Sequence, residues 1–207
     1  MPVARKNLYS WLALGDSYTI GESVEFADRY PAQAVKLLAA DGIYFSEPEI
    51  IAQTGWTTSN LLKAINEKKI PFPAYDMVSL LIGVNDQYQG RSPVEYRAQF
   101  NSLLQQSIQM AGDKPSHVIV LSIPDYSVTP YARGIDTFYI SRQIDSFNTV
   151  SKELAASYKV QYLNITAESR KASDDPDLLA GDGLHYSGKE YSVWAGRLAL
   201  TIGEILK

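Results

Sequence analysis

The chain alternates short apolar runs with segments of helical periodicity, and this alternation is the feature that most constrains its fold. Runs with the length of buried strands occur at 9–14, 49–53, 77–82, 117–123 and 160–165. Helical periodicity or capping signals mark 29–40, 57–68, 93–110, 136–158 and 187–206. Five strand–helix repeats predict an α/β fold, with one parallel sheet covered by helices on both faces in a three-layer α/β/α arrangement.

No linker, repeat or low-complexity stretch divides this pattern, so we expect residues 1–207 to form a single domain. Two helix starts carry capping-box signals, Ser92 with Glu95 and Ser187 with Glu190. The one long irregular segment is 168–186, and a loop of that length inside a compact domain is usually functional or mobile.

The chain contains no cysteine. This excludes disulfides, thiolate catalysis and sulfur-ligated zinc together. It also leaves localisation open, because a cysteine-free protein tolerates the cytoplasm and an oxidising compartment alike. A cytoplasmic protein and an exported one whose signal segment has been removed are both compatible with the sequence.

The charge pattern limits the partners that the chain can have. Its formal net charge is -4 and no cluster of Lys and Arg stands out, so the electrostatic signature of a nucleic-acid-binding protein is missing. No apolar run approaches the length of a membrane span. We expect a small-molecule ligand, and the sequence gives no indication of oligomeric state.

Polar segments follow four of the predicted strands, where ligands of open parallel sheets bind. They are Gly15-Asp16-Ser17-Tyr18, Thr54-Gly55-Trp56, Gly83-Val84-Asn85-Asp86 and, across the long loop, Asp182-Gly183-Leu184-His185. Because the carboxyl ends of parallel strands meet at one edge of a sheet, we expect these segments to converge.

Each segment has a possible role in acyl transfer. Ser17 is a candidate nucleophile, His185 its base, and Asp182 the carboxylate that orients the imidazole. The Ser17 and Gly55 backbone N–H groups and the Asn85 amide are candidate donors to an oxyanion. The only other histidine, His117, opens the fourth predicted strand and should lie at the opposite edge of the sheet.

The four segments together resemble the motif blocks of the SGNH (GDSL-type) hydrolases, in the family's order and across most of the chain. The resemblance implies a flavodoxin-like sheet of order 2-1-3-4-5. It implies Ser17 as nucleophile, His185 as base, Asp182 as its partner, and Gly55 and Asn85 as oxyanion donors. We expect neither metal nor cofactor, because the chain has no cysteine and the one histidine of the predicted site is committed to Ser17. One departure is Tyr18, where the family's name-giving pattern has Leu.

Each residue also has a purely structural interpretation when it is taken alone. A serine such as Ser17 is often a helix cap, Gly55 could be a turn residue with positive φ, and Asn85-Asp86 could form an Asx turn. Asp16 is interpreted as a structural acceptor for loop amides. The acidic loop 174–177 could bind calcium, although it lacks the ordered spacing of a calcium loop. Large aromatic residues could line the pocket or simply pack in the core: Trp56, Tyr88, Tyr126 and Tyr131.

The leading hypothesis is an esterase or acylhydrolase. The alternative is a non-catalytic ligand- or carbohydrate-binding domain on the same scaffold. A flavin or phosphate binder is disfavoured, because the first loop lacks a phosphate cradle rich in Gly, Ser and Thr. Short-chain esters, acetylated sugars, lysophospholipids and thioesters all suit this machinery. The loop 125–134 should help to form the acyl or leaving-group pocket.

Overall fold

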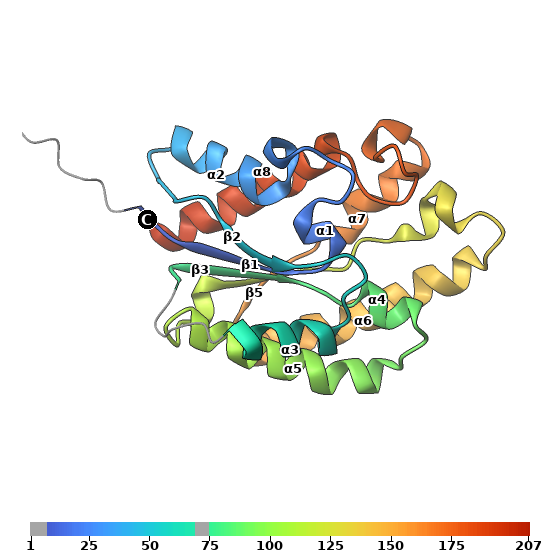
Figure 1. Cartoon of the computed structure of the whole chain (residues 1–207), viewed down its shortest axis with the longest axis horizontal. Helices are drawn as coiled ribbons and strands as arrows, with labels where there is room; N and C mark the ends of the chain where they lie inside the picture. Colours follow the sequence, from blue (N-terminus) through green and yellow to red (C-terminus); the bar gives the residue numbers. More distant parts are fainter. Residues whose placement is uncertain (1–7, 69–74) are drawn as a thin grey trace, which may run out of the picture.

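The computed structural model describes residues 8–68 and 75–207, and its five strands form one parallel sheet in the order β2-β1-β3-β4-β5 (Figure 1). The strands are β1 (Trp11–Gly15), β2 (Glu49–Ala52), β3 (Met77–Leu81), β4 (Val118–Leu121) and β5 (Gln161–Leu163). The α/β class and the strand order expected from the resemblance are therefore confirmed.

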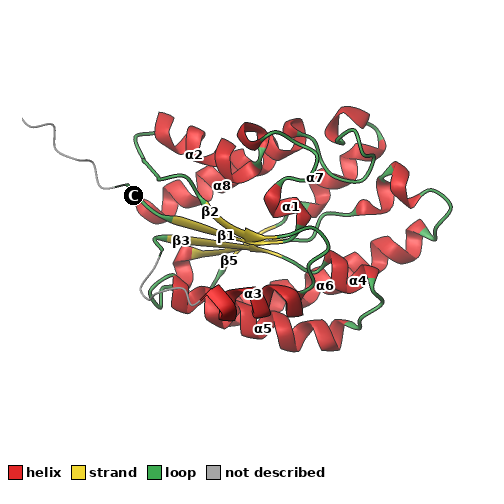
Figure 2. Ribbon diagram, viewed as in Figure 1, coloured by secondary structure: helices red, strands yellow, loops and turns green. Residues whose placement is uncertain are grey.

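Helices cover both faces of the sheet (Figure 2). On one face, α2 (Tyr30–Ala40) packs against α8 (Gly188–Leu206). On the other face lie α3 (Thr58–Lys68), α5 (Pro93–Met110) and α6 (Thr137–Tyr158), with α5 packed against both of its neighbours. The result is the predicted three-layer arrangement.

Short helices occupy the connections. Three are α-helical turns: α1 (Ser17–Ile20), α4 (Val84–Tyr88) and α7 (Thr166–Ser169). The others are 3-10 turns: η1 (Phe26–Asp28), η2 (Pro115–His117), η3 (Tyr126–Val128), η4 (Pro130–Ala132), η5 (Arg170–Ser173) and η6 (Pro176–Leu178). The segment 168–186, expected to be irregular, is thus partly ordered by α7, η5 and η6.

The centre of the sheet is its most buried part. Every residue of β1 and β3 is buried. Ser79 interrupts the apolar run of β3, and its hydroxyl accepts a 3.0 Å hydrogen bond from the Trp11 indole N–H. That partner explains how a polar residue is tolerated at the middle of the core.

The two predicted capping boxes have different outcomes. The box at α5 is confirmed, with Ser92 and Glu95 hydrogen-bonded reciprocally. The prediction of a capping box at α8 was wrong, because Ser187 makes no side-chain cap hydrogen bond there. The Ser187 hydroxyl donates instead to the carbonyl of Asp177, and Glu190 is buried, where it accepts a 2.6 Å hydrogen bond from Trp194. Burial against a tryptophan directs the Glu190 side chain away from the helix start.

None of the helices in the described part of the chain combines the length and apolarity that a membrane span requires.

The register of the sheet brings the loops after β1, β2 and β3 together. Gly15, the last residue of β1, pairs with Ala52 of β2 on one side and with Leu81 of β3 on the other. A Cβ atom at Gly15 would lie less than 3.0 Å from both the Thr19 side chain and the Leu81 carbonyl oxygen. Glycine is therefore required here by close backbone approach.

We expect Gly15→Ala to lower the free energy of unfolding by about 1–3 kcal/mol, because a buried methyl group would be forced against backbone that cannot yield. Gly196→Ala is the matched control, since a Cβ there meets open space within helix α8. It should raise stability by about 0.4–1 kcal/mol. Urea unfolding of both variants measures the difference, and equal effects would contradict this account.

Candidate active site

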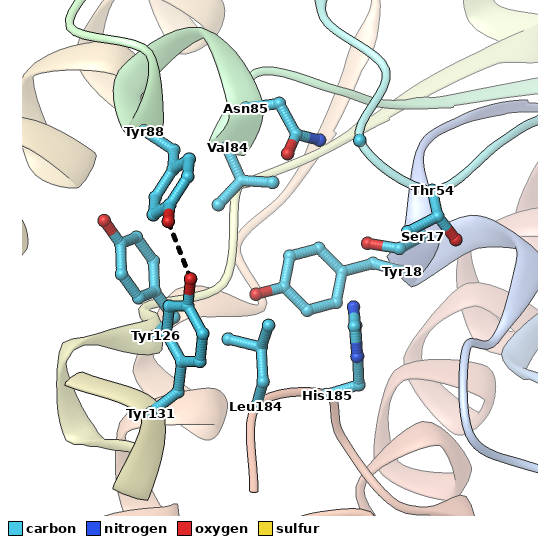
Figure 3. Close-up of a pocket in the computed structure, with 11 residues that line it drawn as sticks. Ser17, Tyr18, Thr54, Val84, Asn85, Tyr88, Tyr126, Tyr131, Leu184 and His185 are labelled. Atoms are coloured by element: carbon cyan, nitrogen blue, oxygen red, sulfur yellow. Dashed lines mark hydrogen bonds between the residues drawn. The ribbon is translucent and has the colours of Figure 1, made fainter. Parts of the chain in front are cut away.

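A single cavity of about 140 Å³ lies at the carboxyl edge of the sheet and collects residues from all four motif segments. Figure 3 shows Ser17 and His185 at one end of it and three tyrosines at the other. Its walls are formed by Ser17, Tyr18, Thr54, Gly55, Val84, Asn85, Tyr88, Tyr126, Tyr131, Leu184 and His185. Of the residues predicted for the site, only Asp182 is absent from these walls, and it lies behind His185.

Ser17 is held in a tight turn that leads from β1 into α1. Asp16 caps the helix by accepting a 3.1 Å hydrogen bond from the Tyr18 backbone N–H. The helix ends after one turn at Gly21, whose φ of 68° is left-handed. Because Ser17 begins the helix, its own N–H has no partner within α1 and is free to serve a ligand.

Asp16 therefore has the structural role expected of it, and its environment adds a second property. Burial raises the pKa of Asp16 to about 8, and the negative charge of Asp86 acts in the same direction. At neutral pH the Asp16 carboxyl is thus mostly protonated. No anion then lies next to Ser17 to repel negative charge that develops there.

His185 and Asp182 are paired as the three-residue spacing suggests. Nδ1 of His185 lies 2.6 Å from Oδ2 of Asp182. The second carboxylate oxygen accepts the backbone N–H groups of Leu184 and His185, each at 2.9 Å. One turn of chain thus fixes the carboxylate, and the carboxylate fixes the orientation of the ring. The other ring nitrogen, Nε2, points into the cavity, where it can accept a proton (Figure 3).

Asp182 is held in its charged form. Partial burial favours the neutral carboxyl, but hydrogen bonds from Ser23, His185 and the Leu184 N–H outweigh it and hold the pKa of Asp182 well below its usual range. A negative charge held beside the far ring nitrogen of an imidazole fixes its tautomer and stabilises the imidazolium.

Ser23 is a participant that the sequence did not reveal. Its hydroxyl donates a 2.6 Å hydrogen bond to Oδ2 of Asp182, the same oxygen that faces His185. Its backbone φ is 65°, a left-handed conformation that is uncommon for serine. The neighbouring Glu22 accepts a hydrogen bond from Thr54, next to Gly55. The turn after α1 therefore ties two of the motif segments together.

Asn85 lies on the side of the cavity opposite His185 (Figure 3), and Gly55 also lines the cavity. Gly55 has a φ of 80° within a turn closed by the Trp56 N–H on the Gln53 carbonyl. The Asn85 amide donates one N–H to the Trp56 carbonyl at 2.9 Å. An amide nitrogen carries two N–H groups, so the second is left for a ligand.

Asp86 does not line the cavity. Its fully buried carboxylate accepts hydrogen bonds from the Thr58 backbone N–H at 2.9 Å and the Thr58 hydroxyl at 2.6 Å, and it pairs with Arg91. It thereby fastens the third motif segment to the start of α3. This contact is long-range and was not expected from the sequence.

The aromatic residues suggested for the pocket divide into two groups. Tyr88, Tyr126 and Tyr131 line the cavity, whereas Trp56 contributes its carbonyl group to Asn85 rather than a wall. Tyr18, the one departure from the family's name-giving pattern, lines the cavity and packs edge-on against His185 at 5.6 Å between ring centroids.

His117 lies at the other edge of the sheet. Its Nδ1 is 2.7 Å from the carbonyl oxygen of Asp76, the residue before β3.

The described residues contain no group of three or more His, Cys, Asp or Glu that could hold a metal ion. In the acidic loop, the carboxylates of Asp175 and Asp177 face the ammonium group of Lys189.

Comparison with known proteins agrees with this arrangement. Residues 13–193 match the model of the GDSL-like lipase/acylhydrolase family. A search of curated proteins gives no match.

Similar solved structures all share the fold at low identity. The acetylxylan esterase Axe2 from Geobacillus stearothermophilus has 23% identity and a TM-score of 0.69, with 94% of each chain covered. A lipase/acylhydrolase from Enterococcus faecalis has 21% identity and a TM-score of 0.67, covering 94% of this chain and 95% of its own. The psychrotrophic esterase EstA from Pseudoalteromonas sp. has 15% identity and a TM-score of 0.71, covering 96% of this chain and 98% of its own.

The family match spans the sheet edge and every motif segment described above, and the chain belongs to the GDSL-like lipase/acylhydrolase family of ester hydrolases.

Proposed function

We propose that the chain hydrolyses carboxylic esters of small molecules through an acyl-enzyme on Ser17, with His185 as base and Asp182 as its orienting acid. The observation that carries the proposal is the convergence of a first-turn serine, an Asp-paired histidine and separate amide donors on one cavity. A domain that only bound a ligand or a carbohydrate would not need these groups together. The solved relatives named as an acetylxylan esterase and a lipase/acylhydrolase act on esters, which supports this class of reaction.

The reaction would proceed in two steps, acylation of Ser17 and hydrolysis of the acyl-enzyme. As the Ser17 oxygen attacks the ester carbonyl carbon, its proton passes to Nε2 of His185, and the carbonyl oxygen becomes an oxyanion. Gly55, Asn85 and the Ser17 N–H donate to that oxyanion. Its collapse breaks the bond to the alcohol oxygen, which takes the proton from His185. Water then attacks the acyl-enzyme by the same route and releases the carboxylic acid.

The nucleophile is tested by a fluorophosphonate probe. We expect whole-protein mass spectrometry to show one adduct, located at Ser17 by peptide mapping, because Ser17 shares a cavity with a histidine base. Ser17→Ala should gain no adduct. A label on another serine, or no label on the folded protein, would refute the assignment and favour a binding domain.

The oxyanion donor is tested by Asn85→Ala. We expect a loss of roughly 10²–10³-fold in kcat, the usual cost of one such donor. KM should change far less, because the donor matters most when negative charge develops. Circular dichroism and thermal melting check that the fold survives. An unchanged kcat in a folded variant would leave Asn85 as a structural residue only.

The base is tested by the pH dependence of kcat/KM. Activity should rise with pH, because the imidazole of His185 accepts the Ser17 proton only when neutral. Asp182→Asn removes the charge that favours the imidazolium. It should therefore lower activity and move the rising part of the pH profile, its acid limb, to lower pH. Ser23→Ala should move the acid limb to higher pH. The Asp182 carboxylate then accepts one hydrogen bond fewer, so its charge favours the imidazolium more strongly.

His117→Gln is the control for these profiles, since His117 lies at the opposite edge of the sheet. Its limb should coincide with that of the parent protein. A shift with His117→Gln, or identical limbs for Asp182→Asn and the parent, would show that the base had been wrongly identified.

A further inference from the structure

The end of the cavity opposite Ser17 is closed by a wall of three tyrosines (Figure 3). Tyr88 ends helix α4, and Tyr126 and Tyr131 come from the turns after β4. The Tyr88 ring packs against the other two, with a centroid distance of 6.3 Å in each case. Tyr126 and Tyr131 are 6.5 Å apart. The three rings therefore form one continuous surface.

A second and larger hollow lies behind this wall. It has a volume of about 490 Å³, against about 140 Å³ for the cavity next to Ser17, and Tyr88 and Tyr126 line both. We call it the outer hollow. Its remaining lining is mixed, with apolar and aromatic side chains beside polar ones: Pro93, Ile135, Tyr139 and Ile140, and Gln87, Arg91, Ser92 and Gln143. Tyr88 and Tyr126 thus border two hollows, each of which has some apolar side chains in its lining.

The wall has a fixed part and a weakly held part. Tyr126 is 4% exposed, its hydroxyl donates a 3.0 Å hydrogen bond to Gln87, and the preceding Asp125 is anchored by Arg170 and Ser141. Tyr88 and Tyr131 are 56% and 44% exposed. Their rings are joined by a 2.7 Å hydrogen bond between the two hydroxyl groups. Water competes for a bond at such an exposed position, so this pair is the part that can open.

The acyl group of a substrate is the part that would face this wall. In the proposed reaction the leaving oxygen must face His185 to receive a proton, and the oxyanion must face Gly55 and Asn85. The direction that remains leads past Val84 and Leu184 to the tyrosines (Figure 3). A cavity of this volume is comparable to one that holds benzene, so it accommodates about six non-hydrogen atoms.

From this geometry, and on the basis of the proposed function, we infer that the hydrogen-bonded pair of Tyr88 and Tyr131 sets the acyl-length limit of the enzyme. Short acyl groups fit in front of the pair. Longer chains require the pair to part and would then occupy the outer hollow. The substrate class is therefore esters of short-chain carboxylic acids, and the limit is set by two exposed side chains rather than by the core.

The test is kcat/KM for p-nitrophenyl esters from acetate to decanoate, with the alcohol held constant. We expect the parent to lose about tenfold or more between butyrate and octanoate, the scale of discrimination that extra methylenes produce in a closed pocket. Tyr88→Ala and Tyr131→Ala should each raise the octanoate-to-acetate ratio by about tenfold or more. Tyr88→Phe, which removes the hydrogen bond and keeps the ring, should raise that ratio less.

Tyr139→Ala is the matched control. Tyr139 is 58% exposed, close to the 56% of Tyr88, but it lines only the outer hollow. Because the Tyr88–Tyr131 pair stays closed in this variant, its octanoate-to-acetate ratio should rise by much less than that of Tyr88→Ala. An unchanged ratio in folded Tyr88→Ala and Tyr131→Ala, an equal rise in Tyr139→Ala, or a shift seen only when the alcohol is lengthened would overturn the inference. In each of those cases the enzyme still hydrolyses acetate, so the proposed function stands. Absence of both ester hydrolysis and Ser17 labelling would overturn the two together.

Discussion

The parallel pairing of β1 with both β2 and β3 is the constraint on which the rest of the site depends. Gly15 ends β1 in register with Ala52 and Leu81, so the next residues of three strands emerge at the same edge. Only glycine permits this approach, because a side chain at position 15 would meet Thr19 and the Leu81 carbonyl. Ser17, Gly55 and Asn85 are consequently brought to one cavity by sheet geometry, and the hydrogen bonds of Asp86 and Glu22 hold the loops there.

Charge is distributed unequally around that cavity. Burial keeps the Asp16 carboxyl largely neutral beside Ser17, whereas hydrogen bonds keep Asp182 ionised behind His185. Two aspartates, one beside Ser17 and one behind His185, thus have opposite protonation states for identifiable reasons. This arrangement suits acyl transfer, in which the imidazole needs a nearby anion and the oxyanion needs none.

Much of this could be predicted from the sequence, because the decisive signals are local. The alternation of strand and helix segments predicts the layers, the polar segments after the strand ends predict the edge, and the strand order followed from the family resemblance. Long-range contacts could not be predicted. The Ser23 hydroxyl reaches Asp182 across 159 residues, and no local pattern marks it. The α8 capping box failed because Glu190 is buried and accepts its hydrogen bond from Trp194, one turn further along the same helix, instead of from the helix start. The contact of Tyr18 with His185 was likewise not predicted, because it joins the two ends of the motif series.

The central claim is that the sheet edge assembles a site complementary to an oxyanion, and a crystal structure of the phosphonate adduct tests it most directly. The account predicts the phosphorus on Ser17 Oγ, with one phosphoryl oxygen about 2.7–3.1 Å from both the Gly55 backbone nitrogen and the Asn85 amide nitrogen. The second oxygen substituent should face His185. An adduct whose phosphoryl oxygen points to solvent, away from Gly55 and Asn85, would contradict the account.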